Sequence, residues 1–407
     1  MGTTDVSYVE ASSRRSRYET VGLVVGFFLL STAAAAYEIA PASVLPLVRT
    51  SMGIDASAAG WLMSVMYATA VVASVPVGIA LDRVSVRRAM TVGGIALVVA
   101  GVWGWFAAAA GAYWWLLVSR VLGGIAYVLF WNAGANTIGR AVGPDVRATA
   151  VGIFTASAPV GFALGQFGSP LLARPFGWPT ILPAFAAIAV VGLGIFLLAT
   201  HGRSIDVEAD SPDRDGFVRL FTDTAVWTLC ACCFLAYSLY LFLNTWLPSF
   251  MVEQFGVPLA VGGVLTALFP AIGVVSRSSS GALSDRVFGR RRRPVTVAAF
   301  AIATPAVVAF AVVSRVAVLV VVLVVSGFAV QLAIGLLFSY VTEVVAAEVR
   351  TTAVSLLTSV GLFGAFVAPI AAGRIIDGVG YTPAFVLAGG VALLGVVLAW
   401  HAPESDG

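Results

Sequence analysis

The stretch Gly78-Ile79-Ala80-Leu81-Asp82-Arg83 ends a long apolar run, and it decides the fold because it returns later in the chain. Its copy, Gly281-Ala282-Leu283-Ser284-Asp285-Arg286, ends another apolar run. A second pair of segments, 146–151 (Val-Arg-Ala-Thr-Ala-Val) and 349–354 (Val-Arg-Thr-Thr-Ala-Val), repeats the spacing of 203 residues that separates 78 from 281. Two independent matches at one spacing indicate that the halves of the chain are a parallel duplication.

The composition of the whole chain places these repeats in a membrane. The 407 residues are 60% hydrophobic and 11% charged, whereas a soluble domain carries about 25% charged residues. Runs such as 316–325 lack the alternation of a transmembrane β-barrel. All 23 basic residues are arginine and the net charge is only +3, so no compact basic region for nucleic acid is predicted. The composition predicts a polytopic, all-α integral membrane protein and argues against a soluble enzyme.

Twelve apolar runs are long enough to span a bilayer. We expect helices at 21–48, 57–81, 89–110, 114–139, 148–172, 179–200, 224–248, 259–283, 294–314, 316–341, 351–373 and 382–401. They form two pseudo-symmetric bundles of six, 21–200 and 223–401. Residues 201–222 are predicted to be a solvated linker because acidic residues crowd there, and residues 1–20 and 402–407 to be tails.

The distribution of arginines predicts the orientation. With the N-terminus inside, seventeen arginines fall on the cytoplasmic side, and only Arg49, Arg174, Arg315 and Arg374 fall on the other side. This bias follows the positive-inside rule. We therefore expect a multi-pass protein of the cell membrane with both termini in the cytoplasm.

The loop after the second expected helix reads Gly-x-x-x-Asp-Arg-x-x-x-Arg-Arg, and through it the chain resembles the major facilitator superfamily. The matching residues are Gly78, Asp82, Arg83, Arg87 and Arg88, and the second copy keeps Gly281, Asp285 and Arg286 before Arg290 to Arg293. The resemblance implies two bundles that rock about a central cavity, with this loop stabilising the outward-facing state. By similarity the conformational switch comprises Gly78, Asp82, Arg83, Arg88, Arg147, Gly281, Asp285, Arg286 and Arg350. Fixing the topology is an equally good explanation for Arg87 and Arg290 to Arg293.

The resemblance does not assign a subfamily. Proton antiporters of the superfamily commonly carry a Gly-Pro step in the fifth helix, where this chain reads Ala158-Pro159. The glycine-rich signatures of nitrate transporters and a sugar-transporter motif are also missing.

Charged residues deep in the spans are few, and two of them are in the first half. Glu38 and Arg120 differ in depth by about one helical turn at about 1.5 Å per residue, so the arginine could reach the acid. Proton-coupled members of the superfamily often pair an acid of helix 1 with the Arg of an Arg-x-x-x-Gly pattern in helix 4, which Arg120 to Gly124 matches. We predict a proton-coupling pair, with a permanent salt bridge as the alternative.

Arg277 is the deep charge of the second half. It precedes Asp285 by eight residues, or about 12 Å of helix, and no acid lies near it in sequence. Serines 276 and 278–280 surround it, which gives this section of the helix a polar face. It is predicted to be either an intracellular gate or a binding residue for an anionic substrate.

Several other polar side chains in the spans are candidates for hydrogen bonding a solute or a neighbouring helix. They are Tyr37, Tyr67, Asn132, Asn136, Gln166, Asn244 and Gln331. The only cysteines, Cys230, Cys232 and Cys233, and the only histidines, His201 and His401, do not form a ligand cluster. We therefore expect no metal and no cofactor.

These features predict a monomeric secondary transporter, not an enzyme, that moves a small organic anion with protons. No Gly-x-x-x-x-Gly-Lys-Ser/Thr phosphate loop is present. A multidrug or metabolite efflux antiporter of the same fold is the first alternative. A non-transporting membrane sensor or scaffold is the alternative from another class.

Overall fold

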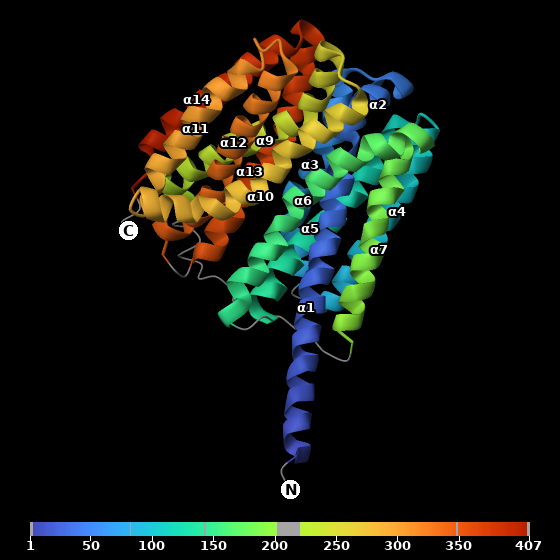
Figure 1. Cartoon of the computed structure of the whole chain (residues 1–407), viewed down its shortest axis with the longest axis vertical. Coiled ribbons are helices and arrows are strands. Elements are labelled where there is room, and N and C mark those ends of the chain that lie inside the picture. Colours follow the sequence, from blue (N-terminus) through green and yellow to red (C-terminus); the bar gives the residue numbers. More distant parts are fainter. Residues whose placement is uncertain (1–2, 82, 142–143, 202–219, 347–348, 405–407) are drawn as a thin grey trace.

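The computed structural model describes residues 3–81, 83–141, 144–201, 220–346 and 349–404, and every regular element within these ranges is a helix (Figure 1). The first half contains α1 (Thr3–Ile39), the 3-10 helix η1 (Ala40–Val44), α2 (Leu45–Met52), α3 (Ala56–Leu81), α4 (Val86–Ala109), α5 (Tyr113–Ala141), α6 (Pro144–Phe176), the 3-10 helix η2 (Trp178–Thr180) and α7 (Ile181–Ala199). The second half contains α9 (Thr224–Phe255), α10 (Leu259–Val287), α11 (Arg292–Ala309), α12 (Val316–Val344), α13 (Arg350–Val379) and α14 (Tyr381–His401).

Local sequence signals fix several helix ends. Gly53 after α2 and Gly256 after α9 have φ angles of 61° and 63°, a left-handed conformation that glycine adopts without strain. Asp223 caps the start of α9, where its carboxylate accepts a hydrogen bond from the backbone N–H of Ala225. These signals place α9 at the residue where the apolar run was expected to begin.

Eleven helical segments of the described chain are long and apolar enough to cross a membrane. This confirms the expected all-α membrane fold. The expected span at 294–314 corresponds to α11, which is not among the eleven; Arg292 and Arg293 at its start lower the mean hydropathy of this 18-residue helix. α1 begins at Thr3 instead of residue 21 and extends beyond the bundle (Figure 1), since residues 3–20 contain no proline or glycine to stop it.

The helices of each half pack mainly on one another. In the first half α1 packs against α6 and α7, and α4 against α5 and α7. In the second half α9 packs against α13, α10 against α12, and α11 against α14. The halves meet mainly through α3 with α13 and α6 with α10. The spacing of 203 residues relates α3 to α10 and α6 to α13, so these two contacts are exchanged by the pseudo-twofold symmetry.

Candidate functional site

Glu38 lies at a meeting point of helices inside the first half. Its side chain, near the end of α1, is 2% exposed. The Tyr67 hydroxyl, on α3, donates a hydrogen bond to Glu38 Oε1. Arg120, on α5, is fully buried beside the same segment, with its guanidinium carbon 4.9 Å from the centre of the Tyr37 ring.

Arg120 binds the backbone of α1 and not the Glu38 carboxylate. Its Nη1 donates to the Tyr37 carbonyl at 2.7 Å and its Nη2 to the Glu38 carbonyl at 2.5 Å. These carbonyls lie in the last turn of α1, and Pro41 has no N–H to donate to the Tyr37 carbonyl four residues earlier. The guanidinium satisfies carbonyls that the helix end leaves open. Among the described residues, no cation is within ion-pair distance of the Glu38 carboxylate.

Arg277 occupies the second half without an anionic partner. The backbone of α10 at Arg277 packs closely on Gly335 of α12, where a Cβ would lie 2.9 Å from the Arg277 Cα. The guanidinium carbon lies 5.1 Å from the centre of the Tyr240 ring on α9. The side chain is partly exposed, its buried Nε has no hydrogen-bond partner, and no described acid forms an ion pair with it. A cation inside a membrane span that has no acidic partner needs water or an anion to compensate its charge.

The ring beside this guanidinium, Tyr240, belongs to a group of aromatic contacts that joins the two halves. Tyr240 stacks on Phe162 of α6, with ring centres 5.5 Å apart and planes 20° apart, and Tyr237 lies 6.4 Å from Tyr240. Tyr127, on α5, lies parallel to Trp131 one turn further along the same helix. Arg277 of the second half therefore lies on a ring, Tyr240, that contacts α6 of the first half.

For three of the amides that were candidates for either a solute or a neighbouring helix, the structure shows the helix contact. Gln166 Nε2 donates to Asn244 Oδ1 at 2.8 Å, which joins α6 to α9 across the halves, and Asn244 Nδ2 donates to the Tyr240 carbonyl. Gln331 Nε2 donates to the Phe269 carbonyl and fits against Gly273, which joins α12 to α10. All three side chains are buried, so we do not include them in the site.

The remaining polar candidates differ in their placement. Tyr37 is buried, and its hydroxyl donates to the Ala100 carbonyl at 3.5 Å. Asn132 is partly exposed beside Trp131. The side chain of Asn136 lies outside the described part of the structure.

The halves are fastened together at one end, which we call the α2 end because α2 lies there. Asp377, on α13, accepts hydrogen bonds from the backbone N–H groups of Ala56 and Ser57 at 2.9 and 2.7 Å, at the start of α3. A carboxylate at a helix N-terminus also interacts favourably with the helix dipole. Arg49 Nη1 pairs with Glu253 Oε1 at 3.1 Å, and the Tyr381 hydroxyl donates to Glu253 Oε2.

Small residues allow the backbones to approach closely at the same end. A Cβ on Gly60 would lie 2.5 Å from the Pro369 carbonyl oxygen, and one on Gly373 would lie 2.4 Å from that of Ala56. Gly263 is equally tight against Pro170. Between described residues, the hydrogen bonds and ion pairs that join the halves all lie toward the α2 end.

The expected switch motif lies at the opposite end, which we call the linker end. Cβ atoms built on Gly78 and Gly281 would have no described neighbour within 4 Å, so in this state neither glycine of the switch motif makes a close helix contact with the described residues. Arg83 and Arg88 are exposed and pair with no described acid. Asp82 and the Arg147 side chain lie outside the described residues.

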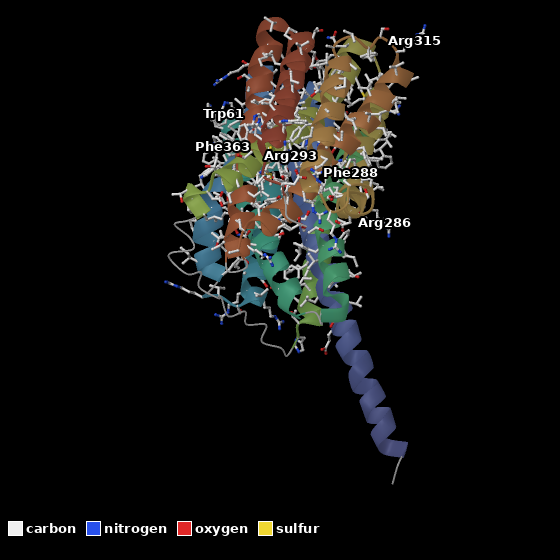
Figure 2. The ribbon with its side chains drawn as sticks, turned by 90° about the vertical axis from the view of Figure 1, so that its left-hand side faces the viewer. Trp61, Arg286, Phe288, Arg293, Arg315 and Phe363 are labelled. Carbon is white, nitrogen blue, oxygen red and sulfur yellow. The ribbon has the colours of Figure 1, made fainter. Side chains whose placement is uncertain are left out.

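The second copy of the motif is held within its own half. Arg292 Nη1 pairs with Asp285 Oδ1 and Nη2 with Glu343 Oε1, both at 2.7 Å, which links α10, α11 and α12. Arg286 and Arg350 are exposed. Figure 2 shows Arg286 toward the linker end and Arg315 at the α2 end of this half, so α11 crosses the full height of the bundle between them.

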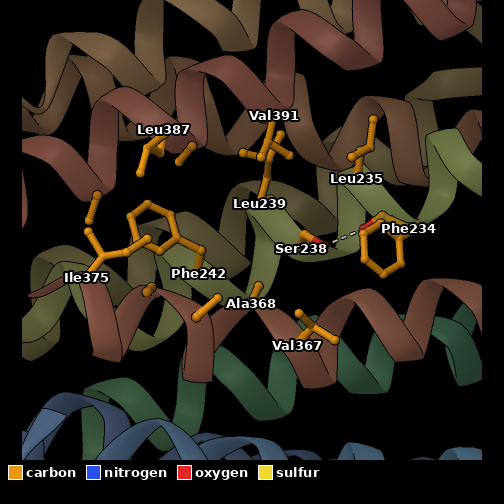
Figure 3. Close-up of a pocket in the computed structure, with 14 residues that line it drawn as sticks. Phe234, Leu235, Ser238, Leu239, Phe242, Val367, Ala368, Ile375, Leu387 and Val391 are labelled. Carbon is orange, nitrogen blue, oxygen red and sulfur yellow. Dashed lines mark hydrogen bonds between the residues drawn. The ribbon is translucent and has the colours of Figure 1, made fainter. Parts of the chain in front are cut away.

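An apolar pocket of about 190 Å³ lies elsewhere, between α9, α13 and α14 (Figure 3). Its one polar side chain, Ser238, donates to the Phe234 carbonyl of its own helix. Because no charged group lines this pocket, it does not suit an anion.

The sequence alone missed Asp377, Glu253 and Arg292. Each stands near the end of an apolar run, where a charge is ordinarily explained by solvation. One sequence feature could have drawn attention to Asp377. It is an acid on the outer side of the membrane, where the predicted orientation places only four arginines.

Helices of spanning length in two packed halves, with the charged residues Glu38, Arg120 and Arg277 inside the spans, define a polytopic helical membrane protein built from two bundles. The model of the Major Facilitator Superfamily matches residues 23–369, and the chain belongs to that family.

Similar proteins agree with this assignment. An uncharacterized MFS-type transporter of Mycobacterium tuberculosis is 28% identical over 268 residues, which span 64% of this chain and only 58% of the relative. The hexuronate transporter of Bacillus subtilis is 24% identical over 372 residues, which span 86% of each protein. The crystal structure of a bacterial homolog of the human lysosomal transporter Spinster, in an inward-facing and occupied conformation, matches with a TM-score of 0.80 at 16% identity and covers 93% of this chain and 96% of that one.

Proposed function

We propose that this protein carries a small organic anion across the cell membrane with protons, by alternating access. Arg277 is the observation that carries the proposal, because it is a partly exposed cation between the halves with no described anionic partner. A carboxylate presents two oxygens that match the guanidinium fork. The hexuronate transporter named above, by its name, carries a carboxylate, which supports this substrate class.

A ligand-stability screen of the purified protein tests this proposal. Binding to the native state raises the melting temperature, so carboxylates should stabilise the protein while cationic and neutral solutes of equal size should not. Stabilisation by cations or neutral solutes alone would favour the multidrug or metabolite efflux antiporter. A protein stabilised by no solute class would fit the sensor or scaffold.

The pattern of contacts supports alternating access. The α2 end is fastened by Asp377 and by the Arg49–Glu253 pair, whereas Gly78 and Gly281 at the linker end face open space. The absence of described contacts at Gly78 and Gly281 is what we expect if the switch motif makes its contacts only in the outward-facing state. We assign the structure to the inward-facing state, with the linker end cytoplasmic.

The first prediction tests this orientation in intact cells. In a background without native cysteines, Asp210→Cys should react with a membrane-impermeant reagent only after the cells are opened. Arg315→Cys, at the other end, should react from outside and serves as the control. Labelling of position 210 from outside would reverse the topology.

The second prediction concerns the fastening at the α2 end. Asp377→Asn should shift the equilibrium by about tenfold or more toward the state open at this end, because hydrogen bonds to a charged group contribute about 1.5–3 kcal/mol. Spin labels at positions 110 and 315, on the two halves, would measure the separation. Asp55→Asn is the matched control, since Asp55 caps the same helix from within its own half by accepting from the N–H of Ala58. Equal shifts in both variants would show that the charge matters and the inter-half bond does not.

A further inference from the structure

The side chains around Arg277 restrict the chemical class of the anion further than the positive charge of Arg277 alone does. Among the described residues Arg277 has no anionic partner, and its guanidinium lies over Tyr240, which is close to Tyr237 and stacks on Phe162 of the first half. On the first half Tyr127 lies parallel to Trp131, and Trp131 packs on Phe154 of the same helix as Phe162. We propose, on the basis of the function proposed above, that the substrate is an aromatic monocarboxylate, with its carboxylate on Arg277 and its ring against the tyrosines.

The charge of the region sets the number of acidic groups on the substrate. Arg120 is fully buried, and both of its terminal nitrogens donate to the Tyr37 and Glu38 carbonyls. Its remaining Nε has no hydrogen-bond partner among the described residues but is buried too, so Arg120 does not present a guanidinium to a second carboxylate. One available guanidinium therefore fits one carboxylate better than a dicarboxylate or a phosphate.

The aromatic side chains set the shape of the rest of the molecule. Tyr240 is sandwiched by Phe162 on one side and the Arg277 guanidinium on another, so it belongs to the wall. Tyr127, Trp131 and Tyr237 are partly exposed, and the hydroxyls of the two tyrosines have no hydrogen-bond partner in the described part of the chain. They offer ring faces for stacking and free hydroxyls for ring substituents.

Benzoate and cyclohexanecarboxylate test the proposal, because they share the charge and nearly the size, and the saturated acid is the more hydrophobic. Calorimetric titration of the full-length protein in nanodiscs should show benzoate binding about twofold to tenfold more tightly, the range of one aromatic pair. Tyr237→Leu and Tyr127→Leu should each reduce this preference, and Tyr127→Phe, which keeps the ring, should retain it. Trp114→Leu, at an exposed ring at the start of α5 and more than three turns before Tyr127, is the control for folding and should change nothing.

The outcomes separate this inference from the proposed function. Equal affinity for the two acids, or no benzoate binding while other carboxylates stabilise the protein, overturns the aromatic class and leaves the anion carrier intact. A dicarboxylate that binds more tightly than either acid also overturns it. Binding of benzamide in place of benzoate overturns both.

Discussion

Replacing Glu38 by Gln should abolish accumulation of substrate driven by a pH gradient, while downhill exchange continues. A gradient of one pH unit stores about 1.4 kcal/mol per proton and supports about tenfold accumulation by a one-proton symporter. The variant should therefore fall from about tenfold accumulation to equilibration. The substitution is nearly isosteric, and the amide oxygen still accepts the hydrogen bond from Tyr67, so the protein should fold.

The physical reason lies in how Glu38 is held. Its carboxyl is buried, and among the described residues it accepts one hydrogen bond, from the neutral hydroxyl of Tyr67. Arg120, the nearest cation, is committed to the Tyr37 and Glu38 carbonyls and does not pair with the carboxylate. An ionised carboxyl in this place is costly, and a proton removes the cost. Rocking of the bundles that exposed Glu38 would remove it too, so proton binding would depend on conformation.

Proteoliposomes loaded at one pH and diluted into another measure both activities in one preparation. Glu343→Gln is the matched control, because it removes an acid of the second half that pairs with Arg292 near the linker end. That control should keep gradient-driven uptake. Full accumulation by the Glu38→Gln protein would place proton coupling elsewhere or make the protein a uniporter.

Much of the fold follows from the sequence because its signals are local. Apolar runs bounded by charges or glycines gave α9 and α14 within one residue of their observed starts, since Asp223 and Gly380 lie immediately before them. The errors come where no local signal stops a helix. α6 was expected at 148–172 and runs from Pro144 to Phe176 through three prolines, which neighbouring helices make tolerable in a membrane.

The site was harder to predict from the sequence. The position of a residue along a helix gives its depth in the membrane, but it does not give the direction in which its side chain points around the helix axis. Glu38 and Arg120 were expected to lie near each other, and they do. The Arg120 guanidinium nevertheless binds backbone carbonyls of α1 and not the Glu38 carboxylate, because Pro41 leaves the Tyr37 carbonyl without its helical donor. The contact between Asp377 and the start of α3 joins two helices far apart in the chain, since Ser57 and Asp377 are separated by 320 residues. Only the packing of α3 on α13 brings them together.

Arg277→Lys should weaken binding of the transported anion sharply, by about tenfold to a hundredfold, while the protein stays folded. Hydrogen bonds to charged groups contribute about 1.5–3 kcal/mol, and the lysine ammonium replaces a planar two-pronged contact by a point charge. The guanidinium also packs over the Tyr240 ring. A lysine ammonium is compact and not planar, so it cannot stack on the ring in the same way. Arg286→Lys, at an exposed position nine residues further along α10, is the matched control and should bind normally. Titration of the purified variants with the anion that best stabilises the wild-type protein measures the loss. If affinity is the same in Arg277→Lys, the arginine acts as a gate between the halves, and the anion must be held by other groups.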